Sequence, residues 1–159
     1  MTLKSTGRGS GLIQRDYILR LIEQLGQFFR RLIESEKDLD AAFEEDKVAP
    51  EELAHSIEET CRQGLGLSFA VLAGMNPSEL ENFCRSSGAA WASRMLLAAY
   101  LLQCDAYLAQ RLGNATRAKA AAEEALYLYE QLHGNAAVPA EYRVEEKRAD
   151  VIRFLQRAQ

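Results

Sequence analysis

The chain has 159 residues, of which 48% are hydrophobic and 26% are charged, and its formal net charge is −4. This length and composition are typical of one globular domain with a sizeable core. The acidic balance argues against binding of nucleic acid, because proteins that contact phosphates carry a basic surface. No apolar run approaches the ~18–20 residues that cross a bilayer, so we expect no membrane partner.

The three cysteines, Cys61, Cys84 and Cys104, are widely spaced and form no Cys-x-x-Cys pair. Each lies beside apolar residues, a position typical of small core residues. Their odd number and spacing argue against a disulfide framework or a zinc site. The sequence therefore predicts buried free thiols in a reducing, cytoplasmic setting, with no cofactor.

The composition predicts an all-α fold. Alanine, leucine, glutamate and arginine are abundant, and the β-branched runs that build strands are absent. We expect about six helices, arranged as helical hairpins around a buried central helix. Residues 1–11 have almost nothing to bury and are expected to be a disordered leader, with a single domain over 12–159.

A broad apolar stripe predicts the first helix over residues 13–34. Three interpretations are open: the stripe packs in the core, forms the seam of a homodimer, or lies on a membrane surface. Asp16 and Glu23 disfavour the membrane. Because aromatic residues and arginines often anchor interfaces, the candidate contact residues are Tyr17, Leu21, Phe28 and Phe29, with Arg15, Arg30 and Arg31 at the rim.

Two further helices are predicted before the centre of the chain. Pro50 followed by two glutamates is a favourable helix start, and that helix extends to about residues 64–67. The apolar run 68–74 is either a last buried turn or a buried loop. Asn76-Pro77-Ser78-Glu79 then predicts a capping box and a short helix that ends near residues 86–88.

The central feature is a predicted helical hairpin over residues 89–133, with its turn at Leu112-Gly113-Asn114. Its first helix is apolar on nearly every side and is therefore expected to be buried. Small residues on the second helix allow close packing: Ala118, Ala121, Ala122 and Ala125. A last helix from about residue 138 has a narrow apolar stripe and is expected to seal the core: Val144, Val151, Ile152, Leu155 and Ala158.

The run 102–130 resembles a tetratricopeptide repeat. Ala106, Ala109, Gly113, Ala118 and Ala125 fall at the spacings of that repeat's small and turn positions. Ala109 stands where an aromatic residue is usual and Glu130 where a proline is usual, and one copy is visible. The resemblance implies a tetratricopeptide-like scaffold without a demonstrated peptide groove.

A second resemblance covers more of the chain. The run 13–23, Ile-Gln-Arg-Asp-Tyr-Ile-Leu-Arg-Leu-Ile-Glu, is similar to the opening of a family of short bacterial proteins that form a domain of unknown function. A pattern similar to 125–129, Ala-Leu-Tyr-Leu-Tyr, follows in the C-terminal half of that family. This resemblance implies membership of that family, but it implies no particular reaction, because the function of the family is unknown.

Two Glu-x-x-His motifs, Glu52 to His55 and Glu130 to His133, have the spacing that carboxylate di-iron bundles use. The helical periodicity places His55 about 200° away from Leu53, at about 100° per residue, and hence toward solvent. His133 lies in a last turn, where the helix dipole favours histidine. The spacing thus gives only an alternative hypothesis, a small-ligand or metal-binding bundle.

No other catalytic motif is present. The two histidines offer no base to a serine or cysteine nucleophile, and there is no glycine-rich phosphate loop. The sequence therefore predicts that the chain is not an enzyme. We expect a helical interaction or scaffold protein that self-associates as a homodimer or binds a protein partner.

Overall fold

The computed structural model describes residues 14–30 and 50–157, and every regular element in these two ranges is helical. A first helix covers residues 14–30. The elements that follow are α2 (Pro50–Leu65), α3 (Phe69–Gly74), α4 (Pro77–Arg85), η2 (Gly88–Ala90), α5 (Trp91–Arg111), α6 (Ala115–Leu132), η3 (Ala140–Tyr142) and α7 (Val144–Arg157). The all-α prediction is confirmed, and the leader expected over 1–11 lies outside the described residues.

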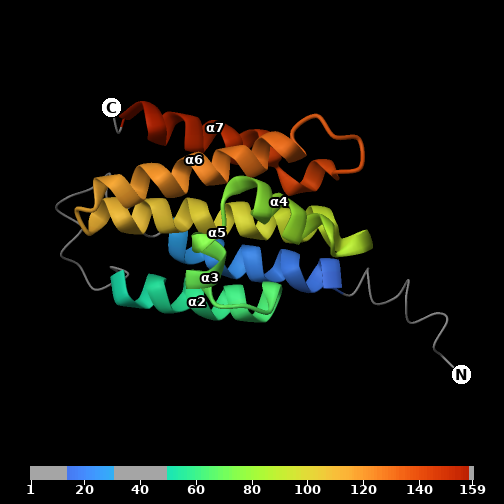
Figure 1. Ribbon diagram of the computed structural model, residues 1–159, viewed down its shortest axis with the longest axis horizontal. Coiled ribbons are helices and arrows are strands. Elements are labelled where there is room, and N and C mark those ends of the chain that lie inside the picture. Colours follow the sequence, from blue (N-terminus) through green and yellow to red (C-terminus); the bar gives the residue numbers. More distant parts are fainter. Residues whose placement is uncertain (1–13, 31–49, 158–159) are drawn as a thin grey trace, which may run out of the picture.

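The helix α5 is the centre of the fold. It packs against α6 as an antiparallel hairpin and also contacts α2, α4 and α7 (Figure 1). Nearly all of its side chains are buried, as the apolar sequence predicted. The turn of the hairpin needs Gly113, whose φ of 79° lies in the left-handed region that favours glycine. Asn114 then caps α6 by accepting a hydrogen bond from the Arg117 N–H.

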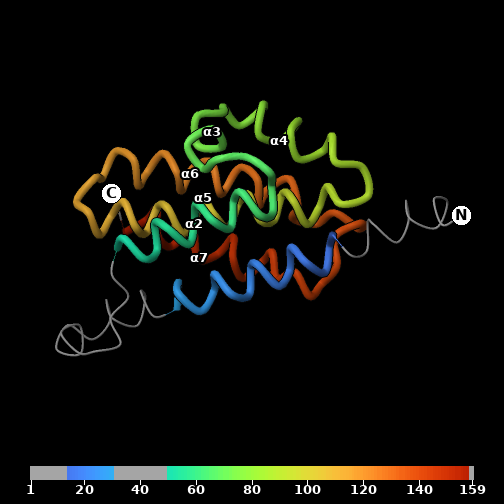
Figure 2. The backbone as a smooth tube through the Cα atoms, turned by 90° about the horizontal axis from the view of Figure 1, so that it is seen from below, coloured from blue at the N-terminus to red at the C-terminus, as the bar shows by residue number. Residues whose placement is uncertain are grey.

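The other helices lie on two sides of this hairpin. Figure 2 shows α3 and α4 on one side, with the helix over 14–30 and α7 on the opposite side. The capping box predicted at Asn76 and Glu79 is present, with both of its hydrogen bonds at 2.9 Å. The hydroxyl of Tyr127 on α6 donates to Glu81 at 2.7 Å, which ties α4 to the hairpin.

The end of α2 is packed tightly against α5. A Cβ atom at Gly64 would lie 2.3 Å from Cδ2 of Leu97 and 3.1 Å from Cδ1 of Leu21, so a larger residue there forces these side chains to shift. Arg94 of α5 donates hydrogen bonds to the carbonyl oxygens of Gly64 and Leu65, both at 3.3 Å. These bonds satisfy carbonyl groups that a helix end leaves free.

The last helix differs from its prediction in two respects. The turn η3 precedes it and buries Tyr142, and the helix itself begins at Val144. Within α7 the buried stripe consists of Val144, Val151 and Phe154, whereas Leu155 is only partly buried. Phe154 takes the inner position because its ring packs at a tilt of 49° against that of Tyr107 of α5, with ring centroids 4.6 Å apart. Ala158 lies outside the described residues.

Candidate functional site

The predicted contact residues of the first helix divide into buried and exposed groups. Leu21 and Phe29 are buried inside the chain, and Phe28 packs against the same core. The ring of Phe29 lies 4.8 Å from that of Tyr107 and 5.5 Å from that of Tyr100. The apolar face of this helix is therefore part of the intramolecular core, one of the three interpretations left open by the sequence.

The exposed group of those predicted residues is small. Tyr17 is 37% exposed, Arg15 lies beside Asp16, and Arg30 lines a cavity that is described below. Arg31 lies outside the described residues. The interface at these residues stays a prediction.

The two Glu-x-x-His motifs do not meet. His55 is exposed and pairs with Glu59 at 3.6 Å, while His133 pairs with Glu145 of α7. Glu130 pairs with Arg148. Among the described residues, no group of three or more histidine, cysteine, aspartate or glutamate side chains is placed to hold a metal ion.

A groove of about 410 Å³ opens between α2, α3, α5 and α6, and we call it the α3 groove. Leu102 and Leu108 of α5 are buried at its base. Its sides are lined largely by small or apolar residues from the other three helices: Ala54, Ile57, Phe69, Ala70, Ala73, Ala120 and Ala121. Because so many of these side chains end at Cβ, the space between the helices is left unfilled by the chain itself.

The short helix α3 forms one border of the groove and exposes apolar surface. No charged residue occurs between Arg62 and Glu79. Within that stretch only Leu72 of α3 is buried, and Val71 is 53% exposed. The run 68–74, expected to be buried, is therefore a helix that lies at the surface. It does so because α3 is short and only one of its side chains reaches the core.

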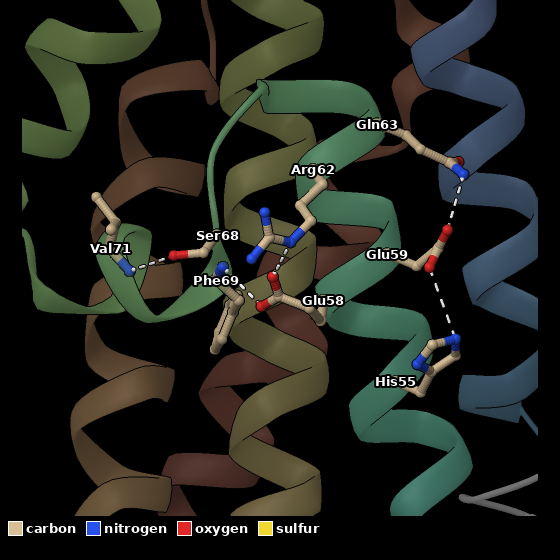
Figure 3. Close-up of polar contacts among 8 residues, drawn as sticks. All are labelled: His55, Glu58, Glu59, Arg62, Gln63, Ser68, Phe69 and Val71. Atoms are coloured by element: carbon tan, nitrogen blue, oxygen red, sulfur yellow. Dashed lines mark hydrogen bonds and ion pairs between the residues drawn. The ribbon is translucent and has the colours of Figure 1, made fainter.

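A specific polar contact fixes α3 beside the groove. The carboxylate of Glu58 on α2 accepts a hydrogen bond from the backbone N–H of Phe69 at 3.0 Å, and it also pairs with Arg62 (Figure 3). The Phe69 bond is the main reason why the pKa of Glu58 is lowered. Ser68 caps the same helix by accepting from the Val71 N–H at 3.4 Å.

Two carboxylates of the hairpin also line the groove. Asp105 on α5 is only 3% exposed and is paired with Arg117 of α6, whose Nε donates to it at 3.2 Å. Glu124 stands two turns further along α6, and its buried Oε2 atom has no hydrogen-bond partner among the described residues. Partial burial raises the pKa of Glu124. Among the described residues, Glu124 is thus the one groove carboxylate that has no cationic partner.

A second cavity of about 680 Å³ lies between the helix over 14–30, α5 and the η3–α7 region. Lys147 reaches into it, donates to the Tyr142 carbonyl oxygen at 3.1 Å and lies 5.7 Å from the centre of the Tyr100 ring. Burial lowers the pKa of Lys147. The charges that line this cavity are nearly balanced, with four acidic and three basic residues: Glu23, Glu141, Glu146, Asp150, Arg30, Arg143 and Lys147. This balance favours no ligand class, so the α3 groove is the stronger candidate.

Comparison of the chain with protein-family models, with curated proteins and with solved structures finds no match. The resemblance of residues 13–23 to a bacterial family and that of residues 102–130 to a tetratricopeptide repeat therefore stay predictions. In the part of the chain that the structure describes, no helix is long and apolar enough to cross a membrane.

The sequence contains one signal for the groove, which an analysis of helical periodicity does not detect. A stretch without charge from Gln63 to Ser78 is unusual in a chain with 26% charged residues. Such a stretch is either buried or kept apolar for contact with another molecule. The position of Glu124 was not predictable, because an isolated glutamate on α6 looks like any solvated helix residue.

Proposed function

We propose that this chain is a non-enzymatic interaction protein whose α3 groove binds an amphipathic helix of a partner protein. The observation that carries the proposal is the uncharged, exposed helix α3 beside an apolar groove of about 410 Å³. Amphipathic helices bind other proteins by placing their apolar face in a groove of this kind. Exposed apolar surface next to a groove marks many protein-interaction sites.

The residues that line the groove favour binding over catalysis. They supply two carboxylates that are already paired with arginines, one carboxylate that is not, and no histidine or cysteine. A general base or nucleophile needs a partner that activates it within hydrogen-bond reach. The groove instead offers an apolar shape and an unpaired charge, which are the features that a binding site uses to recognise a partner.

Three further parts of the proposal rest on the sequence. We infer a tetratricopeptide-like hairpin in α5–α6, a relationship to the bacterial family with the similar first helix, and a reducing, cytoplasmic setting. The close packing of α5 on buried alanines such as Ala118 and Ala125 supports the first. The three free, buried thiols support the last.

The proposal can be tested with a displayed library of amphipathic helical peptides. The wild-type chain is used for selection, and the selected peptides are then measured against Val71→Asp and Tyr17→Asp. Val71 is the exposed apolar residue of α3 that lies in sequence between the lining residues Ala70 and Ala73. An aspartate there lies in the first turn of α3, where it suits the helix dipole, so this variant is expected to fold. We expect Val71→Asp to weaken binding at least tenfold and Tyr17→Asp to leave it unchanged.

Two results would overturn the proposal. Peptides that lose binding with Tyr17→Asp and not with Val71→Asp would place the interface on the first helix. A wild-type dimer in light scattering that Val71→Asp converts into folded monomers would show that a second copy of the chain, and not a separate partner, occupies the groove.

A further inference from the structure

The charges around the α3 groove are arranged so that one carboxylate remains available. Glu58 is held by the Phe69 N–H and Arg62, and Asp105 is held by Arg117. Glu124 lines the same groove, and its Oε2 atom is buried without a hydrogen-bond partner among the described residues. A buried oxygen without a hydrogen-bond partner destabilises a folded protein, so such atoms call for an explanation.

The surroundings of Glu124 exclude an internal partner of opposite charge in the described part of the chain. Of the residues that line the groove, the only base is Arg117, and its guanidinium is bound to Asp105. The α3 side of the groove carries no charge at all. Three carboxylates against one arginine give the lining a net negative charge, which attracts a cation and repels an anion.

We propose that the partner helix carries a lysine or arginine that pairs with Glu124 when its apolar face enters the α3 groove. This inference rests on the proposed function, and it names the chemistry of the partner: apolar residues at helical spacing with one basic residue among them. The apolar residues contact Phe69, Ala73 and Ala120, and the basic side chain extends toward the α6 wall of the groove.

The state of Glu124 in the free chain supports this assignment. Partial burial without a compensating charge raises the pKa of Glu124, because the ionised carboxylate is less stable in the free protein than in water. A bound ammonium or guanidinium group reverses that effect, because an opposite charge nearby favours the ionised form. Binding of the partner therefore releases protons from Glu124 at pH values near its raised pKa, and binding weakens as the pH falls.

The test uses the full chain and a peptide obtained by the selection described above. Its dissociation constant is measured with wild type, Glu124→Gln and Glu123→Gln, each against the peptide and a version in which its basic residue is replaced by glutamine. Glu123 is the matched control, because it is the neighbouring carboxylate on α6, is exposed and lies outside the groove lining.

We expect Glu124→Gln to weaken binding about tenfold and Glu123→Gln to change it less than twofold. Replacing the peptide's basic residue should cost the same tenfold in wild type and almost nothing in Glu124→Gln, since both changes remove one interaction. The wild-type affinity should fall on acidification, and the Glu124→Gln affinity should fall less. The other charged groups that line the groove, namely Glu58, Asp105 and Arg117, are unchanged in both proteins.

The outcomes separate this inference from the proposed function. Two results would overturn the assigned pair and leave the groove as the binding site. The first is selected peptides that are weakened by Val71→Asp but contain no basic residue. The second is additive losses of binding free energy from Glu124→Gln and from replacement of the peptide's basic residue. Selected peptides that are insensitive to Val71→Asp would overturn both.

Discussion

Glu58 of α2 accepts a hydrogen bond from the backbone N–H of Phe69, the first residue of α3, at 3.0 Å (Figure 3). This bond connects two helices that otherwise share few contacts, and it satisfies one of the free N–H groups at the start of α3. It fixes the border of the α3 groove from the side of α2. The position of the proposed binding surface therefore depends on one carboxylate.

The first prediction concerns that carboxylate. Glu58→Ala should loosen α3 while leaving the hairpin intact, because α3 buries only Leu72. Hydrogen exchange should show faster exchange for the amides of 71–75 and no change in α5. The control is Glu59→Ala, which removes an exposed partner of His55 and Gln63 and no contact with α3.

The same carboxylate predicts a pH effect. The pKa of Glu58 is lowered mainly by the Phe69 bond, so the folded state binds a proton less readily than the unfolded chain. Its stabilising effect is therefore fully present above the ordinary pKa of a glutamate and is lost as the pH falls through the lowered value. Exchange of the α3 amides, corrected for intrinsic rates, should accelerate on acidification in wild type and not in Glu58→Ala. Equal acceleration in both proteins would contradict this role.

The second prediction concerns the close approach of α2 and α5. Gly64→Ala places a Cβ atom 2.3 Å from a methyl group of Leu97, whose side chain is fully buried and must shift to make room. We expect a loss of about 1–3 kcal/mol in the free energy of unfolding, measured with urea. Gly74→Ala is the control, because nothing lies within 4 Å of its Cβ position. The packing account would be wrong if both substitutions had the same effect.

The third prediction concerns the pair between Asp105 and Arg117. Arg117→Ala leaves a carboxylate that is 3% exposed without its partner and should cost about 2 kcal/mol of stability. Combining it with Asp105→Leu should restore most of that loss, since the buried charge is then removed as well. Arg153→Ala breaks a more exposed pair with Asp150 and should cost less than about 0.5 kcal/mol. Urea denaturation of the three variants checks all three expectations, and a double variant no more stable than Arg117→Ala would contradict them.

The fourth prediction follows from the free carboxylate of Glu124. Glu124→Gln should raise the free energy of unfolding at pH 7 by about 0.5–1 kcal/mol, because a partly buried unpaired charge is removed. The pKa of Glu124 is raised in the folded state, so the cost is absent at low pH and appears as the pH rises through that pKa. The gain should therefore shrink on acidification, whereas Glu123→Gln should give none. A substitution that costs stability at pH 7 would show that Glu124 has an internal role.

The fifth prediction concerns the first helix. Phe29 is 3% exposed between Tyr100 and Tyr107, so Phe29→Glu should cost at least about 3 kcal/mol and unfold part of the chain. Tyr17→Glu changes a residue that is 37% exposed and should cost less than about 0.5 kcal/mol. Circular dichroism and light scattering together check both variants. Folded monomers of Phe29→Glu derived from a wild-type dimer would contradict the buried position.

Much of the fold was predictable because local signals and burial agree along most of the chain. The capping box at Asn76, the glycine turn at Gly113 and the largely apolar α5 each indicate one structure, and each is present. The boundaries of α7 were less predictable. The turn η3 is held by burial of Tyr142, and a single inward ring in an irregular segment has no periodicity that would reveal it.

The candidate site was much less predictable than the fold. A helical stripe identifies residues that lie on one face, but it does not say whether that face meets its own chain or another. For Leu21 and Phe29 the deciding information is that α5 supplies Leu97, Tyr100 and Tyr107 opposite them. For Glu124 the deciding information is that, among the described residues that line the groove, the only arginine is already bound to Asp105, which depends on residues far apart in the sequence.

The most direct test of the proposed binding surface is a map of amide chemical shifts by NMR as a selected helical peptide is added to the isotope-labelled chain. The largest changes should occur around the α3 groove, at the lining residues Phe69, Ala73, Ala120 and Glu124 and at the exposed Val71 of α3. Changes concentrated on the helix over 14–30, with these five residues unaffected, would contradict the proposed binding surface.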